Sequence, residues 1–154
     1  MNEHFENAVE EMKRVDHLIY VSLKYTRTVD VIRNTLIRII ASFDEAINAL
    51  LKHSGVEDLP TVPKAKVDLI RQKYPDKQMD AFMTFYQYLR KLMRSDFDRR
   101  EEYRRHVTMI TKLEKHRVEV NIDNLETTYE RMARNFINLV YEKLKEKPDK
   151  KKKK

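Results

Sequence analysis

The scarcity of glycine is the strongest constraint on what this chain can fold into. Gly55 is the only glycine among 154 residues, and only four prolines occur. Glycine is the residue that most readily adopts the positive φ angles of tight turns, and proline interrupts helices and strands. A chain with so few of both favours long helices joined by few connections.

Apolar residues recur at helical spacing through the first third of the chain. Over residues 5–23 and 29–50 they fall at steps of three and four, which predicts two helices, each with one buried stripe. Thr28 is predicted to cap the second helix at its N-terminus, and Gly55 follows its end.

The middle of the chain predicts a loop, a short helix and a third long helix. Pro60 and Pro63 place the loop at 56–63, and a short helix over 64–74 is stopped by the proline that follows. Asp76 is predicted to cap the long helix, whose apolar stripe runs over residues 79–93.

Residues 107–122 differ from the rest because apolar and polar residues alternate with a period of two. The alternation and the β-forming residues predict a small hairpin turning near Glu114–His116. A continuous helix with Phe97 and Leu113 on one side is the alternative. Asp123 is predicted to cap the last helix, with Glu126 completing a capping box.

These elements predict an all-α fold, an up-and-down bundle of four main helices with a short extra helix and a small β-hairpin near 107–122. Residues 1–147 are expected to form one helical domain, because the chain is long enough to bury a core. Residues 148–154, which are mostly lysine, are expected to be a disordered tail.

The composition excludes several classes of function. The chain has no cysteine, so it has no disulfide, thiolate nucleophile or cysteine-based zinc site. A single glycine cannot build a glycine-rich phosphate loop, and we expect neither a cofactor nor a metal site. No apolar run reaches the roughly 18 residues of a membrane span, and the first residues do not resemble a secretory signal. We therefore expect a cytoplasmic protein with no membrane partner.

The net charge of +7 comes mostly from the C-terminal end. Residues 147–154 contain six lysines and one aspartate, which leaves a charge of about +2 for the rest of the chain. The basic character therefore indicates no general basic binding face. The tail could add affinity for nucleic acid by counterion release.

One segment, Ser95–His106, concentrates groups able to bind phosphate and to move a proton, and we call it the arginine-rich segment. It holds four arginines, four carboxylates, a tyrosine and a histidine. Arginine forks suit phosphate, and an imidazole can take the proton from a ribose 2′-OH while arginine stabilises the charge on phosphorus oxygens. Arg27 and Arg33 would enlarge such a site if the fold brought them near His106.

The spacing of Arg100 and, after five residues, His106 in a helical protein resembles the HEPN superfamily (higher eukaryotes and prokaryotes nucleotide-binding). Arg99, followed by six residues and the same histidine, also fits. The resemblance implies a motif near the start of a late helix. It also implies a homodimer whose two motifs face each other across a cleft, acting as a metal-independent endoribonuclease. Glu101 and Thr108 depart from the residues common at their places in that family.

Three functions follow for the arginine-rich segment. In the first, the protein is a ribonuclease with His106 as general base and Arg100, helped by Arg99, on the phosphate. In the second, it binds RNA without cleaving it, through Tyr103, Arg104 and Arg105. In the third, the charges pair with each other at helical spacing, and the protein is a scaffold that dimerises or holds a protein partner.

Overall fold

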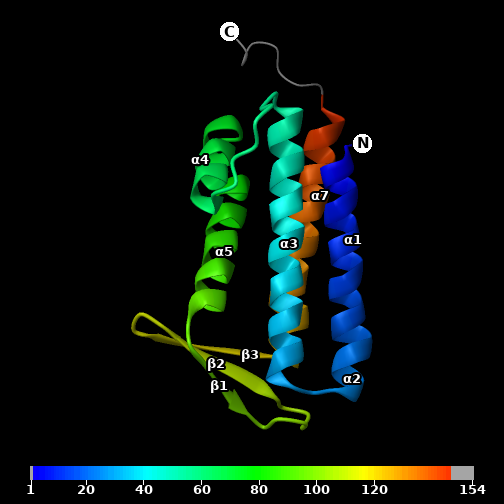
Figure 1. Ribbon diagram of the computed structural model, residues 1–154, viewed down its shortest axis with the longest axis vertical. Coiled ribbons are helices and arrows are strands. Elements are labelled where there is room, and N and C mark those ends of the chain that lie inside the picture. The colour runs from blue at the N-terminus through cyan, green and yellow to red at the C-terminus, as the bar shows by residue number, and fades with distance from the viewer. Residues whose placement is uncertain (1, 147–154) are drawn as a thin grey trace.

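The computed structural model describes residues 2–146 and shows a mostly helical protein with a small three-stranded antiparallel sheet (Figure 1). The helical elements and strands are, in chain order, α1 (Glu3–His17), the π-helix η1 (Leu18–Ser22), α2 (Leu23–Tyr25), α3 (Val29–His53), α4 (Pro63–Lys73), α5 (Lys77–Arg94), β1 (Phe97–Arg100), β2 (Thr108–Leu113), β3 (His116–Asn121), α6 (Ile122–Asn124), the π-helix η2 (Leu125–Glu130) and α7 (Arg131–Lys145).

The helix starts predicted at Thr28 and Asp76 are confirmed. Thr28 Oγ1 accepts a hydrogen bond from the Val31 amide at 3.3 Å, and Asp76 Oδ1 accepts one from the Met79 amide at 2.7 Å. Each bond satisfies a backbone donor that the first turn of a helix leaves without a partner. Beyond the end of α3, Gly55 has a φ of 100°, a conformation that glycine adopts without steric cost.

Helix α3 is the central element of the helical part. It packs against α1, α5 and α7, and Figure 1 shows it between α5 and α1 with α7 behind. The buried stripes of these helices meet in one hydrophobic core. Phe43 of α3 stacks on Phe136 of α7 with ring centroids 4.5 Å apart, so aromatic packing joins helices distant in sequence.

The predicted hairpin is confirmed, and the continuous helix over the same residues is wrong. Strands β2 and β3 pair in antiparallel register from Thr108 opposite Asn121 to Leu113 opposite His116. Glu114 takes a φ of 55° in the turn between them, so this turn forms without a glycine. Met109 and Val120 lie opposite each other and are fully buried.

The arginine-rich segment supplies a third strand that the sequence did not predict. Strand β1 pairs antiparallel with β2, from Phe97 opposite Thr111 to Arg100 opposite Thr108. The all-α class is therefore corrected to a mostly helical fold with a small sheet. In Figure 1 the sheet lies at the end of the molecule where α5 ends and α3 begins.

The predicted cap at Asp123 is wrong, because the last helical region begins two residues earlier. Asn121 Oδ1 accepts from the Asn124 amide, and Asn124 Oδ1 accepts from the Asn121 amide, each at 2.9 Å. Strand β3 continues to Asn121, so the chain turns into the helix there and this asparagine pair forms the capping box.

The lysine tail predicted at 148–154 lies outside the described residues. Within residues 2–146, no helix is both long enough and apolar enough to cross a membrane.

Candidate functional site

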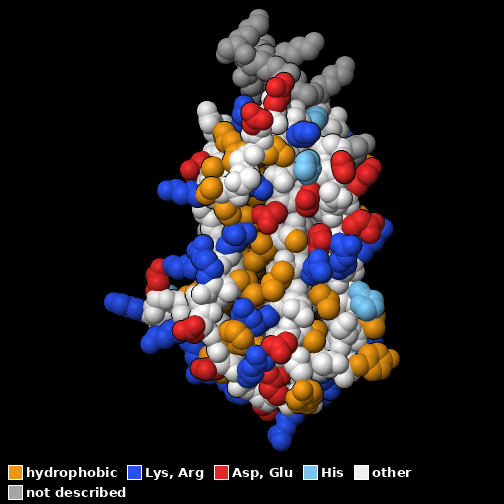
Figure 2. All heavy atoms as spheres, viewed as in Figure 1, with side chains coloured by type: hydrophobic (Ala, Val, Ile, Leu, Met, Phe, Trp, Pro, Cys, Tyr) orange, Lys and Arg blue, Asp and Glu red, His pale blue; other side chains and the backbone are white. Residues whose placement is uncertain are grey.

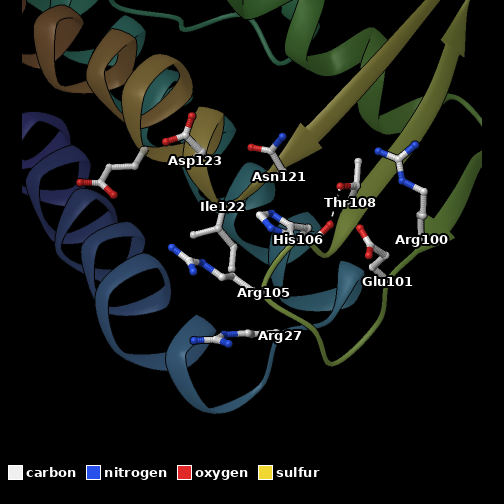
Figure 3. A pocket seen from close by; sticks show the side chains of 10 residues that line it. Arg27, Arg100, Glu101, Arg105, His106, Thr108, Asn121, Ile122 and Asp123 are labelled. Atoms are coloured by element: carbon white, nitrogen blue, oxygen red, sulfur yellow. Dashed lines mark hydrogen bonds between the residues drawn. The ribbon is translucent and has the colours of Figure 1, made fainter.

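An open pocket of about 770 Å³ lies where the loop of residues 101–107 meets the junction between α2 and α3 and the start of α6. We call it the arginine pocket. Figure 3 shows its lining side chains, which come from three stretches of the chain: Arg27, residues 100–108 and residues 121–126. The lining residues are Arg27, Arg100, Glu101, Arg105, His106, Thr108, Asn121, Ile122, Asp123 and Glu126.

The loop 101–107 folds back onto the start of the helical part. The Tyr103 amide donates to the Arg27 carbonyl at 2.6 Å, which joins the loop to the α2–α3 junction. Glu101 and Tyr103 adopt positive φ angles of 55° and 65°, which let the chain reverse within a few residues. The Thr108 hydroxyl donates to the His106 carbonyl at 2.8 Å and fixes the end of the loop.

Glu102 fastens this loop to the N-terminus of α3. Its Oε2 accepts from the Val29 amide at 3.0 Å, so a carboxylate lies at the positive end of the helix dipole. Arg99 donates to Glu102 at 3.1 Å and to Asp30 at 2.9 Å. Hydrogen bonds to Asp30 and Glu102 raise the pKa of Arg99. Arg99 therefore connects the sheet to α3 and does not line the pocket.

Arg100 lines the pocket, but a carboxylate balances its charge. Its guanidinium donates to Glu119 of β3 at 2.6 Å, and Arg117 approaches the second oxygen of the same carboxylate at 3.1 Å. In the view of Figure 3, the Arg100 guanidinium lies on the far side of Thr108 from His106. Arg100 is therefore less available to a phosphate than the sequence suggested.

Arg27, Arg105 and His106 form the part of the pocket that is free to bind a ligand. Within residues 2–146, none of these three side chains makes an ion pair. Arg105 and His106 are exposed and Arg27 is half-buried. In Figure 3 the guanidinium groups of Arg27 and Arg105 extend toward the same side of the pocket.

The lining also contains as many carboxylates as arginines, so the arginine pocket is not uniformly positive. The carboxylates are Glu101, Asp123 and Glu126. Glu126 accepts a hydrogen bond from the Tyr20 hydroxyl at 3.3 Å. Within residues 2–146, Arg27 and Arg105 are the lining arginines that have no carboxylate partner.

The structure brings together some of the site residues predicted from the sequence. Of the catalytic candidates, Arg100 and His106 line the arginine pocket and Arg99 does not. Of the RNA-binding candidates, Arg105 lines it, whereas Tyr103 and Arg104 are exposed on the same loop.

From the sequence, Arg27 belongs to the site only if the fold brings it near His106, and the structure places it in the arginine pocket. Its position depends on the contact between the loop and the α2–α3 junction, which no local sequence pattern signals. Arg33 does not line the pocket. Its guanidinium lies 4.0 Å from the centre of the Phe97 ring and donates to the Met93 carbonyl at 3.5 Å.

The arginine-rich segment is not helical, which bears on two expectations. One ion pair forms inside the segment, between Arg99 and Glu102 three residues apart, whereas Arg99 and Arg100 also reach Asp30 and Glu119 on other elements. The resemblance to the HEPN superfamily implies a helical motif, whereas Arg100 ends β1 and His106 lies in the loop. Membership of that superfamily stays a prediction.

Among residues 2–146, no group of three or more histidine, aspartate or glutamate side chains is arranged to hold a metal ion. Comparison of the chain with protein-family models, with curated proteins and with solved structures finds no match. The geometry of the arginine pocket is therefore the evidence for function.

Proposed function

We propose that the protein binds RNA at the arginine pocket, with Arg27 and Arg105 on the phosphate backbone and His106 beside them. One observation carries the proposal: two arginines from distant parts of the chain line one open pocket next to a histidine. Neither arginine has a carboxylate partner within the described part of the chain.

The chemistry of these groups suits a phosphodiester. A guanidinium offers paired donors in a plane and stays charged at every physiological pH. Each phosphate contact releases condensed counterions, so binding should weaken as salt rises.

We also propose an up-and-down order for the four main helices. With that order, the end of the first helix and the start of α3 would both lie at the sheet, where the arginine pocket is.

Fluorescence anisotropy with a labelled 12-nucleotide single-stranded RNA tests the proposal. We expect Arg27→Ala and Arg105→Ala each to weaken binding by about tenfold and to lower the salt slope by roughly one, as for a lost phosphate contact. Arg38→Ala is the matched control, because Arg38 pairs with Glu11 on the helical part and does not line the pocket.

A variant that ends at Glu146 separates the pocket from the lysines that follow it. If this variant loses binding while Arg27→Ala and Arg105→Ala bind like the wild type, the pocket is not the RNA site. If the wild type has no affinity for RNA at 0.15 M salt, the scaffold function is favoured.

A second candidate, metal-independent RNA cleavage, is favoured by the position of His106. Its side chain is exposed in the pocket beside Arg105 and makes no hydrogen bond within residues 2–146. The imidazole would take the proton of the ribose 2′-OH, the 2′ oxygen would attack phosphorus, and the 5′ oxygen would leave with a proton from water. Arg105 would stabilise the charge on the phosphate oxygens.

Cleavage of labelled RNA in the presence of EDTA tests this candidate. We expect His106→Ala to abolish product while retaining most of the RNA affinity, and Arg38→Ala to cleave like the wild type. An unchanged rate in His106→Ala would exclude this histidine as the base. If cleavage needs two motifs facing each other, sedimentation velocity at tens of micromolar should show a dimer.

A further inference from the structure

Tyr25 and Tyr103 are the two most exposed large apolar side chains of the described residues, with 85% and 77% of their surface accessible. Both lie beside the arginine pocket. The Tyr103 amide bonds to the Arg27 carbonyl at 2.6 Å, and Tyr25 precedes Arg27 by two residues, which span at most about 7 Å of chain. Figure 2 shows apolar side chains exposed at this end of the molecule, with charged groups around them.

These two tyrosines differ from the other six in the chain. Three of the six donate a hydrogen bond: Tyr20 to Glu126, Tyr74 to the Leu50 carbonyl, and Tyr86 to Asp44. Two more, Tyr88 and Tyr129, are hydrogen-bonded to each other through their hydroxyls. The sixth, Tyr141, packs on Phe5. Within residues 2–146, neither Tyr25 nor Tyr103 makes a side-chain hydrogen bond or a ring contact.

The backbone beneath both rings is nevertheless held in place. Tyr25 ends α2, and the next amide, that of Thr26, bonds to the Ser22 carbonyl at 2.8 Å. Tyr103 follows Glu102, which is anchored to Val29 at the start of α3. Two large rings are thus fixed at their base, exposed to solvent and placed next to arginines.

We propose that Tyr25 and Tyr103 form a stacking surface for unpaired bases, so that the RNA bound at the arginine pocket is single-stranded. This inference rests on the proposed function. Aromatic side chains stack on splayed bases while neighbouring cations hold the backbone. Bases inside a duplex already have both faces covered, so a duplex offers no free base face to these two rings.

Arg104 and Arg105 follow Tyr103 directly, and Arg27 follows Tyr25 by two residues. This spacing favours RNA over an apolar protein partner, because each tyrosine has an arginine within two residues along the chain that can reach a neighbouring phosphate. A protein partner would need to cover the same cations with carboxylates. If the tyrosines bound such a partner and not RNA, the affinity for RNA would not depend on whether the RNA carries bases.

Anisotropy with three labelled probes tests the inference: a 12-nucleotide single strand, the same sequence as a duplex, and a strand of equal length with abasic sites. We expect the wild type to bind the normal single strand most tightly. Tyr25→Ala and Tyr103→Ala should each weaken that binding by about 5- to 150-fold and leave the abasic strand nearly unaffected. The salt slope should not change, because no phosphate contact is removed.

The aromatic variants Tyr25→Phe and Tyr103→Phe should retain binding, and Tyr141→Ala at another site is the matched control. Thermal melting by circular dichroism checks that the variants are folded. If the alanine variants bind the single strand like the wild type, or if the wild type prefers the duplex or the abasic strand, the inference is overturned and the proposed function stands. If the wild type binds none of the three probes, the proposed function falls, and this inference falls with it.

Discussion

Glu130 places a carboxylate inside the helical part, where only 6% of its side chain is accessible. It accepts hydrogen bonds from Arg134, including one from Nε at 2.8 Å, and Arg134 also donates to Asp16 at 3.2 Å. Burial raises the pKa of Glu130, although its bonds to Arg134 act in the opposite direction. The folded state therefore holds the Glu130 proton to a higher pH than the unfolded chain does.

This difference determines the sign of a pH effect on stability. Between the unfolded and folded pKa values the folded state binds more protons, so the contribution of Glu130 to the free energy of unfolding decreases as the pH rises through that window. We expect Glu130→Gln to become more stable relative to the wild type as the pH rises from about 4.5 toward neutral. Urea unfolding at several pH values measures the difference, with Glu142→Gln as an exposed control. A difference that does not change with pH would contradict the prediction.

At the scale of the element, helix starts were predictable where the capping residue comes just before the apolar stripe. Thr28 and Asp76 each precede an apolar stripe and cap the expected helix. At residues 121–124 two overlapping patterns compete, one beginning at Asn121 and one at Asp123. The choice between them depends on how far β3 pairs with β2, and that pairing is a tertiary contact that local spacing does not reveal.

Substitution distinguishes the two caps. We expect Asn121→Ala to lower the free energy of unfolding by about 1 kcal/mol, because the Asn124 amide loses its acceptor. Asp123→Ala should cost less than about 0.5 kcal/mol, because the exposed side chain of Asp123 contributes only through its place in the first turn. Chemical denaturation measures both variants. Equal losses, or a larger loss for Asp123→Ala, would show that the capping box is not formed as described.

At the scale of the whole molecule, the parts predictable from the sequence are those whose residues are close together in the chain. The amphipathic helices and the β2–β3 hairpin have local periodicities that the sequence displays. Strand β1 has none, since one apolar residue is followed by three charged ones. It forms because β2 offers an edge and because Phe97 packs under the Arg33 guanidinium. The site residues show the same dependence on closeness in the chain. Arg105 and His106 are adjacent in the sequence and were predicted together, whereas Arg27 joins them only through the fold.

Substitution of Glu102 tests whether the contact between the loop of residues 101–107 and the start of α3 positions the site. Removing its carboxylate leaves the Val29 amide without an acceptor and frees one end of Arg99, which still reaches Asp30. We expect Glu102→Ala to lower the free energy of unfolding by about 1–2 kcal/mol, because hydrogen bonds to charged groups are stronger than neutral ones and this group is partly exposed.

In Glu102→Ala, the loop of residues 101–107 should lose more protection from hydrogen exchange than the helices do. In hydrogen exchange, the Tyr103 amide of Glu102→Ala should lose protection, while amides in the middle of α3 should keep theirs apart from the global change. RNA affinity should fall with an unchanged salt slope, since Glu102 does not line the arginine pocket and no phosphate contact is lost. Asp98→Ala is the control, because this exposed carboxylate of β1 makes no ion pair within residues 2–146 and does not line the arginine pocket. If both variants exchange and bind alike, the contact between loop and helix does not hold Arg105 and His106 beside Arg27.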